Sequence, residues 1–159
     1  MHSRLATTGL IALAVFAAAC GGSTPAASNP SPSPSPVATG TVIAVATNTT
    51  FGQILVDGKG MTVYLFVADT GTSSTCYTSC ATIWPPVLTD GAPQAGAGAD
   101  KSLLGTTTRT DGKVEVTYAG HPLYYFVKDK AAGDTTGQGV NGFGALWWVM
   151  SPSGAAITN

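Results

Sequence analysis

Alternation of apolar and polar residues predicts a series of short β-strands after residue 40. β-Branched and aromatic residues gather in seven runs of four to seven residues, bounded mainly by Gly, Pro, Asp and Thr. No window of a dozen residues repeats its apolar positions with the 3.6-residue period of a helix. We therefore expect an all-β fold, an antiparallel sandwich or small barrel. The predicted strands cover residues 41–46, 53–56, 62–67, 103–109, 113–118, 122–127 and 146–150.

An internal duplication divides this β region into two related halves. When the chain is shifted by 60 residues, 50–69 aligns with 110–129, and eight of the twenty positions are identical. Two copies are too few for a solenoid. The sequence therefore predicts one pseudo-symmetric domain over residues 41–159, with repeats at about 41–90 and 101–151.

The chain begins with the features of a bacterial export signal. A short polar start that contains Arg4 is followed by an apolar run at residues 10–19, which is too short to span a bilayer. Small residues then precede Cys20, and this ending resembles the bacterial lipobox. The resemblance implies that residues 1–19 are a signal peptide and that acyl chains on Cys20, such as palmitate, hold the protein to a membrane. The alternative is an ordinary secretory signal that is cut after the same alanines.

Residues 20–40 are predicted to be a tether. Ser-Pro repeats occupy residues 30–36, and the segment shows no apolar periodicity. Such a segment cannot bury a core, and its prolines favour an extended spacer. We therefore expect a lipid-anchored domain on the outer face of a bacterial membrane, most simply the cell membrane, with the bilayer as its first partner.

Composition narrows the classes of function. Only 9% of the residues are charged, whereas an ordinary soluble domain has about 25%. The formal net charge is −1, so we expect no basic patch and no nucleic-acid partner. Removal of the signal would leave His121 as the only histidine, which argues against three-ligand catalytic zinc. The sequence contains no Gly-x-Ser-x-Gly motif, the nucleophile elbow that would indicate a hydrolase.

Two motifs carry a resemblance to a known family. Residues 64–69 and 124–129 both fit the pattern Tyr-x-aromatic-x-x-Asp. This pattern resembles the motif of the bacterial secreted-repeat lipoproteins, and residues 76–86 and 133–149 resemble the segments that follow each motif. The resemblance covers nearly all of residues 41–159. Because this family has no established activity, the resemblance implies a location and an architecture but no reaction.

The motif residues are candidates for a structural framework or a binding surface. The two aromatic residues of each motif lie two apart on a strand and so share one face. Each aspartate falls just past the strand end, where a carboxylate can accept backbone N–H groups and organise the turn. The alternative is a pair of carboxylates for acid–base catalysis, but the same slot in both repeats favours a framework. These residues are Tyr64, Phe66, Asp69, Tyr124, Phe126 and Asp129.

Cys76 and Cys80 are the next candidate site. With Cys20 acylated, they remain as a pair in an exported chain, where a structural disulfide is expected. The alternative is a copper or thiol-redox site, because soft ligands favour Cu(I). Its candidate further ligands are His121, Met61 and Met150.

The tryptophans are candidates for a ligand platform. Trp147 and Trp148 are adjacent, so on a strand they face opposite sides and one is expected in the core. The other, beside Trp84 or Tyr125, would offer a platform to a sugar or another ligand. We therefore expect a non-enzymatic envelope module that binds an unknown ligand and uses no cofactor. The alternatives are a copper-handling or thiol-redox protein and a carbohydrate-directed enzyme or lectin.

Overall fold

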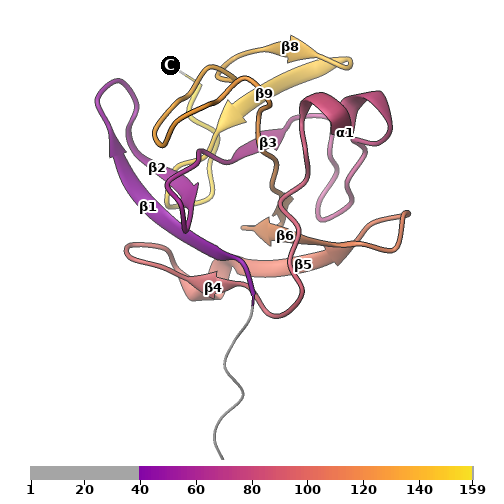
Figure 1. Cartoon of the computed structure of the whole chain (residues 1–159), viewed down its shortest axis with the longest axis horizontal. Coiled ribbons are helices and arrows are strands. Elements are labelled where there is room, and N and C mark those ends of the chain that lie inside the picture. The colour runs from indigo at the N-terminus through magenta and orange to yellow at the C-terminus, as the bar shows by residue number, and fades with distance from the viewer. Residues whose placement is uncertain (1–39, 159) are drawn as a thin grey trace, which may run out of the picture. The chain divides into compact units, whose positions relative to one another are not determined.

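Nine short strands form three small sheets in residues 40–158, the part of the chain that the computed structural model describes (Figure 1). Every neighbouring pair of strands is antiparallel except β1 with β4, which is parallel. The all-β fold predicted from the sequence is confirmed. The sheets contain, in spatial order, β2 (Gly52–Asp57), β1 (Val42–Asn48) and β4 (Gln94–Ala95); β3 (Tyr64–Phe66), β9 (Ala145–Val149) and β8 (Asn141–Gly142); and β5 (Leu104–Thr108), β6 (Val114–Tyr118) and β7 (His121–Pro122).

Four short elements are absent from the predicted pattern. Besides β4 and β8, they are the helix α1 (Ser79–Ile83) and the 3-10 helix η1 (Lys101–Leu103). Each has five residues or fewer, so none repeats an apolar position often enough to show a period. The predicted strand at 122–127 is also mostly wrong, because β7 ends at Pro122 and only isolated bridges follow it.

Short polar side chains determine where the first two strands end. Oδ1 of Asn48 accepts the backbone N–H groups two and three residues later, at 2.9 and 3.1 Å. After β2, Oδ1 of Asp57 accepts the N–H groups of Lys59 and Met61 at 2.8 and 2.9 Å. A side chain that satisfies its own turn in this way stops the strand and starts the next one.

The duplication is visible as a pseudo-two-fold arrangement of a first half (residues 41–90) and a second half (residues 101–151). At its centre, the Tyr64 N–H donates to the Tyr124 carbonyl at 2.8 Å and the Tyr124 N–H donates to the Tyr64 carbonyl at 3.0 Å. Equivalent bonds flank this pair. The valine that follows each motif phenylalanine donates its N–H to the carbonyl of the residue just before a core tryptophan of the other half. The two halves therefore meet backbone to backbone at the motif tyrosines.

The structural offset between the halves is 60 residues at the motifs but 61 in the preceding hairpins. Val63 donates to the carbonyl of Leu55, and its counterpart Leu123 donates to the carbonyl of Val116. Leu55 and Val116 therefore occupy equivalent positions, although the sequence shift of 60 aligns Val116 with Val56. The loop between β6 and β7 is one residue shorter than its counterpart, and a one-residue slip turns every side chain to the opposite face.

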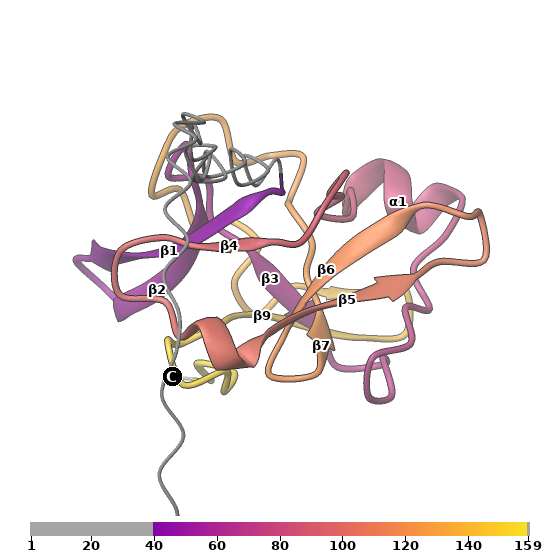
Figure 2. The ribbon, with the colours of Figure 1, turned by 90° about the horizontal axis from the view of Figure 1, so that it is seen from below.

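Two core clusters lie on opposite faces of β2, which inserts Ile54 and Val56 into one and Leu55 into the other. Figure 2 shows β4 alongside β1, and β5 alongside β6. The aromatic cluster contains Ile54, Val56, Tyr64, Phe66, Cys76, Cys80, Trp84, Tyr124, Phe126, Trp147 and Val149. The aliphatic cluster contains Ile43, Leu55, Val63, Leu65, Val87, Val116, Tyr118, Leu123 and Met150.

Candidate functional site

The motif tyrosines and aspartates pair across the two halves. The Tyr64 hydroxyl donates to Asp129 Oδ2 at 2.6 Å, and the Tyr124 hydroxyl donates to Asp69 Oδ2 at 2.6 Å. Both tyrosine side chains are fully buried, and Asp69 and Asp129 are 8% and 7% exposed. Burial, together with the carboxylate partner, raises the pKa of each tyrosine well above its ordinary value. Each hydroxyl therefore stays protonated and remains a donor.

The other oxygen of each motif carboxylate closes the loop that follows it. Asp69 Oδ1 accepts the backbone N–H and the hydroxyl of Thr75 at 2.7 and 2.6 Å. Asp129 Oδ1 accepts the same two groups of Thr136 at 2.9 and 2.5 Å. Each buried carboxylate therefore already holds three donors, out of the roughly four acceptor positions that its two oxygens offer.

Trp84 and Trp147 lie in the core, so the predicted ligand platform is wrong for Trp84, whereas Trp147 is the one residue of the adjacent pair that was expected in the core. They are 1% and 0% exposed, and their rings stack with centroids 4.0 Å apart. Phe66 stacks on Trp147 and Phe126 stacks on Trp84, at 4.0 and 4.1 Å, which makes one continuous stack from residues of both halves. Trp148 faces the opposite side of β9, as predicted, but it is half-buried against the aliphatic cluster.

Cys76 and Cys80 form a disulfide, as the sequence predicts. The bond encloses the start of α1 and lies in the aromatic cluster, where the two cysteines are 0% and 6% exposed. The Cys76 sulfur is 3.8 Å from the Trp84 carbonyl oxygen, and since a disulfide sulfur carries no hydrogen, this is a packing contact. In this oxidised form the pair offers no thiolate to a metal.

The cysteines and two of the other candidate copper ligands, Met150 and His121, belong to different parts of the described domain. Cys76 and Cys80 pack in the aromatic cluster, whereas Met150 packs in the aliphatic cluster and His121 pairs with Tyr118 of that cluster. Within residues 40–158, no group of three His, Cys, Asp or Glu side chains is placed to hold a metal ion.

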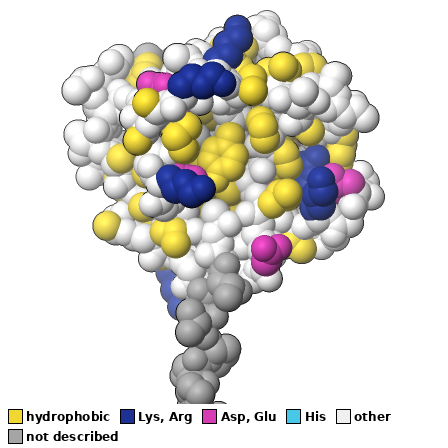
Figure 3. Space-filling view, viewed as in Figure 1, with side chains coloured by type: hydrophobic (Ala, Val, Ile, Leu, Met, Phe, Trp, Pro, Cys, Tyr) yellow, Lys and Arg dark blue, Asp and Glu magenta, His cyan; other side chains and the backbone are white. Residues whose placement is uncertain are grey.

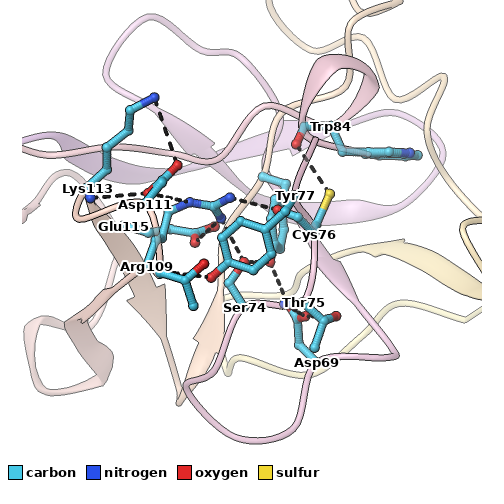
Figure 4. A network of polar contacts seen from close by, with 12 residues as sticks. Asp69, Ser74, Thr75, Cys76, Tyr77, Trp84, Arg109, Asp111, Lys113 and Glu115 are labelled. Atoms are coloured by element: carbon cyan, nitrogen blue, oxygen red, sulfur yellow. Dashed lines mark hydrogen bonds and ion pairs between the residues drawn. The ribbon is translucent and has the colours of Figure 1, made fainter. Parts of the chain in front are cut away.

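A buried ion pair, Arg109 with Glu115, was missed by the sequence analysis. Nη1 of Arg109 donates to Glu115 Oε2 at 2.8 Å and to the Ser74 hydroxyl at 2.7 Å, while Nη2 donates to the Cys76 carbonyl at 2.7 Å (Figure 4). The Tyr77 ring covers the guanidinium carbon at 4.3 Å. The pair therefore links the β5–β6 hairpin to the disulfide loop.

This network continues to the motif, because the Ser74 and Tyr124 hydroxyls are 2.7 Å apart. Complete burial raises the pKa of Glu115 to about 7, although Arg109 opposes the shift. The signal that could have identified the pair is composition: Glu115 is the only glutamate of the sequence, and it stands between two valines of a predicted strand. With Glu115 at 0% and Arg109 at 3% exposed, a substrate cannot reach either charge.

A groove follows β5 on the surface of the second half. A cavity of about 640 Å³ lies between residues 88–92 and the β5–β6 hairpin, where Thr106, Lys113 and Val114 line it. A second cavity of about 300 Å³ adjoins it at Thr106 and extends to Lys101. The floor of the larger cavity is apolar and open to solvent, since Leu88 and Val114 remain 39% and 38% exposed.

The charged side chains around this domain are dispersed. In Figure 3, apolar side chains gather near the centre of one face, with Lys and Arg side chains spaced around them. Lys113 at one end of the groove is 61% exposed and lies 4.0 Å from Asp111. The groove therefore combines exposed apolar side chains with the charged side chains of Asp90, Lys101 and Lys113.

The fold and these contacts define an all-β domain of two interlocked halves. A family model described as a secreted repeat of unknown function matches residues 45–88 and 105–151, one match in each half. The chain belongs to this secreted-repeat family, which supports an exported protein. No curated protein and no solved structure matches the chain. None of the helices in residues 40–158 is long and apolar enough to cross a membrane.

Proposed function

We propose that this protein is a non-enzymatic binding module, anchored by lipid outside the cytoplasm, which takes its ligand in the groove along β5. The groove is the observation that carries the proposal, because it is the place where apolar side chains, polar threonines and accessible charges meet at the surface. The charged residues of the core network are buried, and the two motif carboxylates together already hold six donors, three on each.

The lipid anchor is part of this proposal and depends on Cys20, which lies outside the described residues. Replacement Cys20→Ser removes the thiol that would be acylated, so we expect the protein to leave the membrane fraction and accumulate in the soluble extracytoplasmic fraction. Fractionation of cells with an antibody against the domain measures this. Retention of the variant in the membrane, with unchanged amounts, would contradict the lipid anchor.

Site-specific photo-cross-linking in living cells tests the binding site. A photoreactive amino acid is placed in the full-length protein at Thr106 or at Val114, both in the groove, and at Phe143 as the control. Phe143 suits this purpose because it is 48% exposed and lies outside both cavities. We expect one adduct of defined mass at the two groove positions and none at Phe143. Adducts at all three positions, or at Phe143 alone, would contradict the proposed site.

The copper-handling or thiol-redox alternative makes a different prediction for the same protein. It requires thiolates at Cys76 and Cys80, whereas the disulfide and its burial support a structural role for this pair. Native mass spectrometry of protein exported and purified without reductant or chelator distinguishes the two. A mass two hydrogens lower than that of the dithiol, with nothing bound, supports the binding module. A dithiol that carries a copper ion supports the alternative.

A further inference from the structure

The outer edges of the equivalent strands β1 and β5 differ. On β1, residues 94–97 form an added parallel strand: the Gln94 N–H donates to the Thr41 carbonyl at 2.9 Å, and the Gly96 N–H donates to the Ile43 carbonyl at 2.7 Å. The Val45 N–H in turn donates to the carbonyl of Ala97 at 2.8 Å. The outer backbone groups of β1 are thereby paired within the domain.

The hydrogen-bond pattern shows which groups of β5 face outward. Leu103 and Arg109 are both bonded to the β6 side, through Ala119 N–H to Leu103 carbonyl at 2.8 Å and Arg109 N–H to Lys113 carbonyl at 2.9 Å. In an antiparallel ladder, residues alternate between bonding inward and pointing outward. The even-numbered residues of β5 therefore direct their N–H and carbonyl groups away from β6. These are Leu104, Thr106 and Thr108.

Most of these outward groups have no partner among residues 40–158. The Leu104 N–H donates to the Lys101 carbonyl at the end of η1. Outside the β5–β6 ladder, the hydrogen bonds of the described residues include none to the Leu104 carbonyl and none to or from the backbone of Thr106 and Thr108. Edge strands are ordinarily protected by a charge, a proline or a bulge, whereas β5 consists of Leu, Gly and three Thr.

The position that β4 occupies on β1 is open on β5. At the offset of 61 residues found for these hairpins, Ile43 corresponds to Leu104 and Val45 to Thr106. The cavity of about 300 Å³ adjoins Leu104 and Thr106 and is also lined by Ala92 and Pro93 of the segment that precedes β4. A cavity lined by β5 and by this preceding segment has room for one extended peptide. A second copy of the domain would have to place its whole sheet in the same space.

We propose that β5 binds an extended peptide segment of a partner protein as an added parallel strand. This inference rests on the proposed function, of which it names the ligand class. Backbone bonds to Leu104, Thr106 and Thr108 would hold the peptide. Small uncharged side chains fit beside the edge, as in the Gln-Ala-Gly-Ala segment that covers β1. An acidic residue at the peptide's amino end would face Lys101, which lines that end of the groove.

A peptide titration followed by NMR tests this with the acetylated and amidated probe Glu-Gln-Ala-Gly-Ala. The probe copies the strand that covers β1 and adds the acidic residue. The full chain in lipid nanodiscs is isotope-labelled, and amide hydrogen exchange is measured with and without the probe. We expect exchange at Thr106 and Thr108 to slow at least tenfold on saturation, with little change at Gly105 and Thr107, whose N–H groups already bond to β6.

Two variants separate backbone recognition from side-chain recognition. Thr106→Pro removes an outward N–H that the β5–β6 ladder does not use, so we expect the domain to fold and the affinity for the probe to fall at least tenfold. Thr106→Val keeps the backbone and removes only the hydroxyl, and we expect its affinity to match that of the wild type. A probe with N-methylated amides leaves the protein unchanged, and we expect no binding of it.

Three outcomes would overturn the inference. Equal loss in Thr106→Pro and Thr106→Val would mean that the side chain is recognised. Equal binding of the N-methylated probe would exclude strand addition. Concentration-dependent self-association through β5, with no response to the probe, would assign the edge to a second copy. In each case the cross-links at Thr106 and Val114 remain a separate test, so the groove can be a binding site even where a peptide strand is not its ligand.

Discussion

A tyrosine and an aspartate of the same motif never bond to each other in this domain. Tyr64 donates to Asp129 and Tyr124 donates to Asp69, so each pair joins the two halves. We infer that the motif is a reciprocal clasp: each half supplies one donor and one acceptor, and the loop after each aspartate is held by a threonine. Its repetition in the sequence is then explained by the pairing of the halves, because one copy alone would leave a buried hydroxyl and a buried carboxylate unpaired.

The substitution Tyr64→Phe tests one member of this clasp. Phenylalanine keeps the ring packing but removes the donor to a buried carboxylate, so we expect the free energy of unfolding to fall by about 1–3 kcal/mol. Tyr125→Phe is the matched control, because its hydroxyl bonds to Asp57 at 3.0 Å from a half-buried position, and we expect a smaller loss. Urea unfolding followed by tryptophan fluorescence measures both. Equal losses would argue against a special role for the buried pair.

Glu115 predicts a dependence of stability on pH. Its folded pKa of about 7 lies above the ordinary value of about 4.5, because burial disfavours the charged form. Between these values the folded state keeps a proton that the unfolded state releases. The contribution of Glu115 to stability is therefore present below about pH 4.5 and is lost as the pH rises to 7, by about 3 kcal/mol in total.

The variant Glu115→Gln isolates this effect because it cannot titrate. We expect the difference in free energy of unfolding between wild type and Glu115→Gln to change between pH 5 and pH 8, with the wild type relatively more stable at pH 5. Thr106→Val, an exposed substitution that removes no ionisable group, serves as the control and should differ from the wild type by the same amount at both pH values. A pH-independent difference for Glu115→Gln would show that this carboxyl keeps its ordinary pKa.

At the scale of elements, the disulfide loop holds α1 and Trp84 against the aromatic cluster. We expect the double variant Cys76→Ala and Cys80→Ala to lose about 2 kcal/mol of stability from loop entropy alone, since the closed loop is short. Burial of both cysteines adds a packing loss. Thermal unfolding measures the loss, and photo-cross-linking at Thr106 should persist in the variant. Loss of that adduct from a folded variant would instead connect the cysteines to function.

Elements with a clear two-residue period could be predicted from the sequence, and the others could not. β1, β2, β3, β5, β6 and β9 fall within one or two residues of their predicted runs. β4 and β8 have two residues each, too few to show a two-residue period; β4 is defined by its pairing with the distant strand β1, and β8 by a tight hairpin with β9. The segment after Pro122 has the composition of a strand but forms only isolated bridges, from Tyr124 to Tyr64 and to Pro86 of the first half.

The candidate site was predictable in part. The framework position of the motif aspartates and the Cys76–Cys80 pairing follow from turn chemistry and compartment. The stacking of Trp84 on Trp147 and the hydrogen bonds of Arg109 to Ser74 and Cys76 join the two halves, and no local pattern records such contacts. The groove likewise arises because one half receives a covering strand from the connecting segment and the other does not.

At the scale of the whole molecule, the two halves are coupled through their motifs and differ at the outer edges of the equivalent strands β1 and β5. The duplicated parts form the shared core, whereas the unequal parts, at β4 and β5, give the second half its groove. Structure and binding are thereby separated in space: residues that hold the halves together lie inside, and the proposed ligand site lies on the open edge of β5.

A pair of double-mutant cycles tests most directly whether each motif tyrosine is coupled to the aspartate of the other half. Unfolding free energies are measured for Tyr64→Phe combined with Asp129→Asn, its partner in the other half, and for Tyr64→Phe combined with Asp69→Asn, in the same motif. We expect a coupling energy of about 1–3 kcal/mol for the first combination and less than about 0.5 kcal/mol for the second. A larger coupling within the motif than across the halves would contradict it.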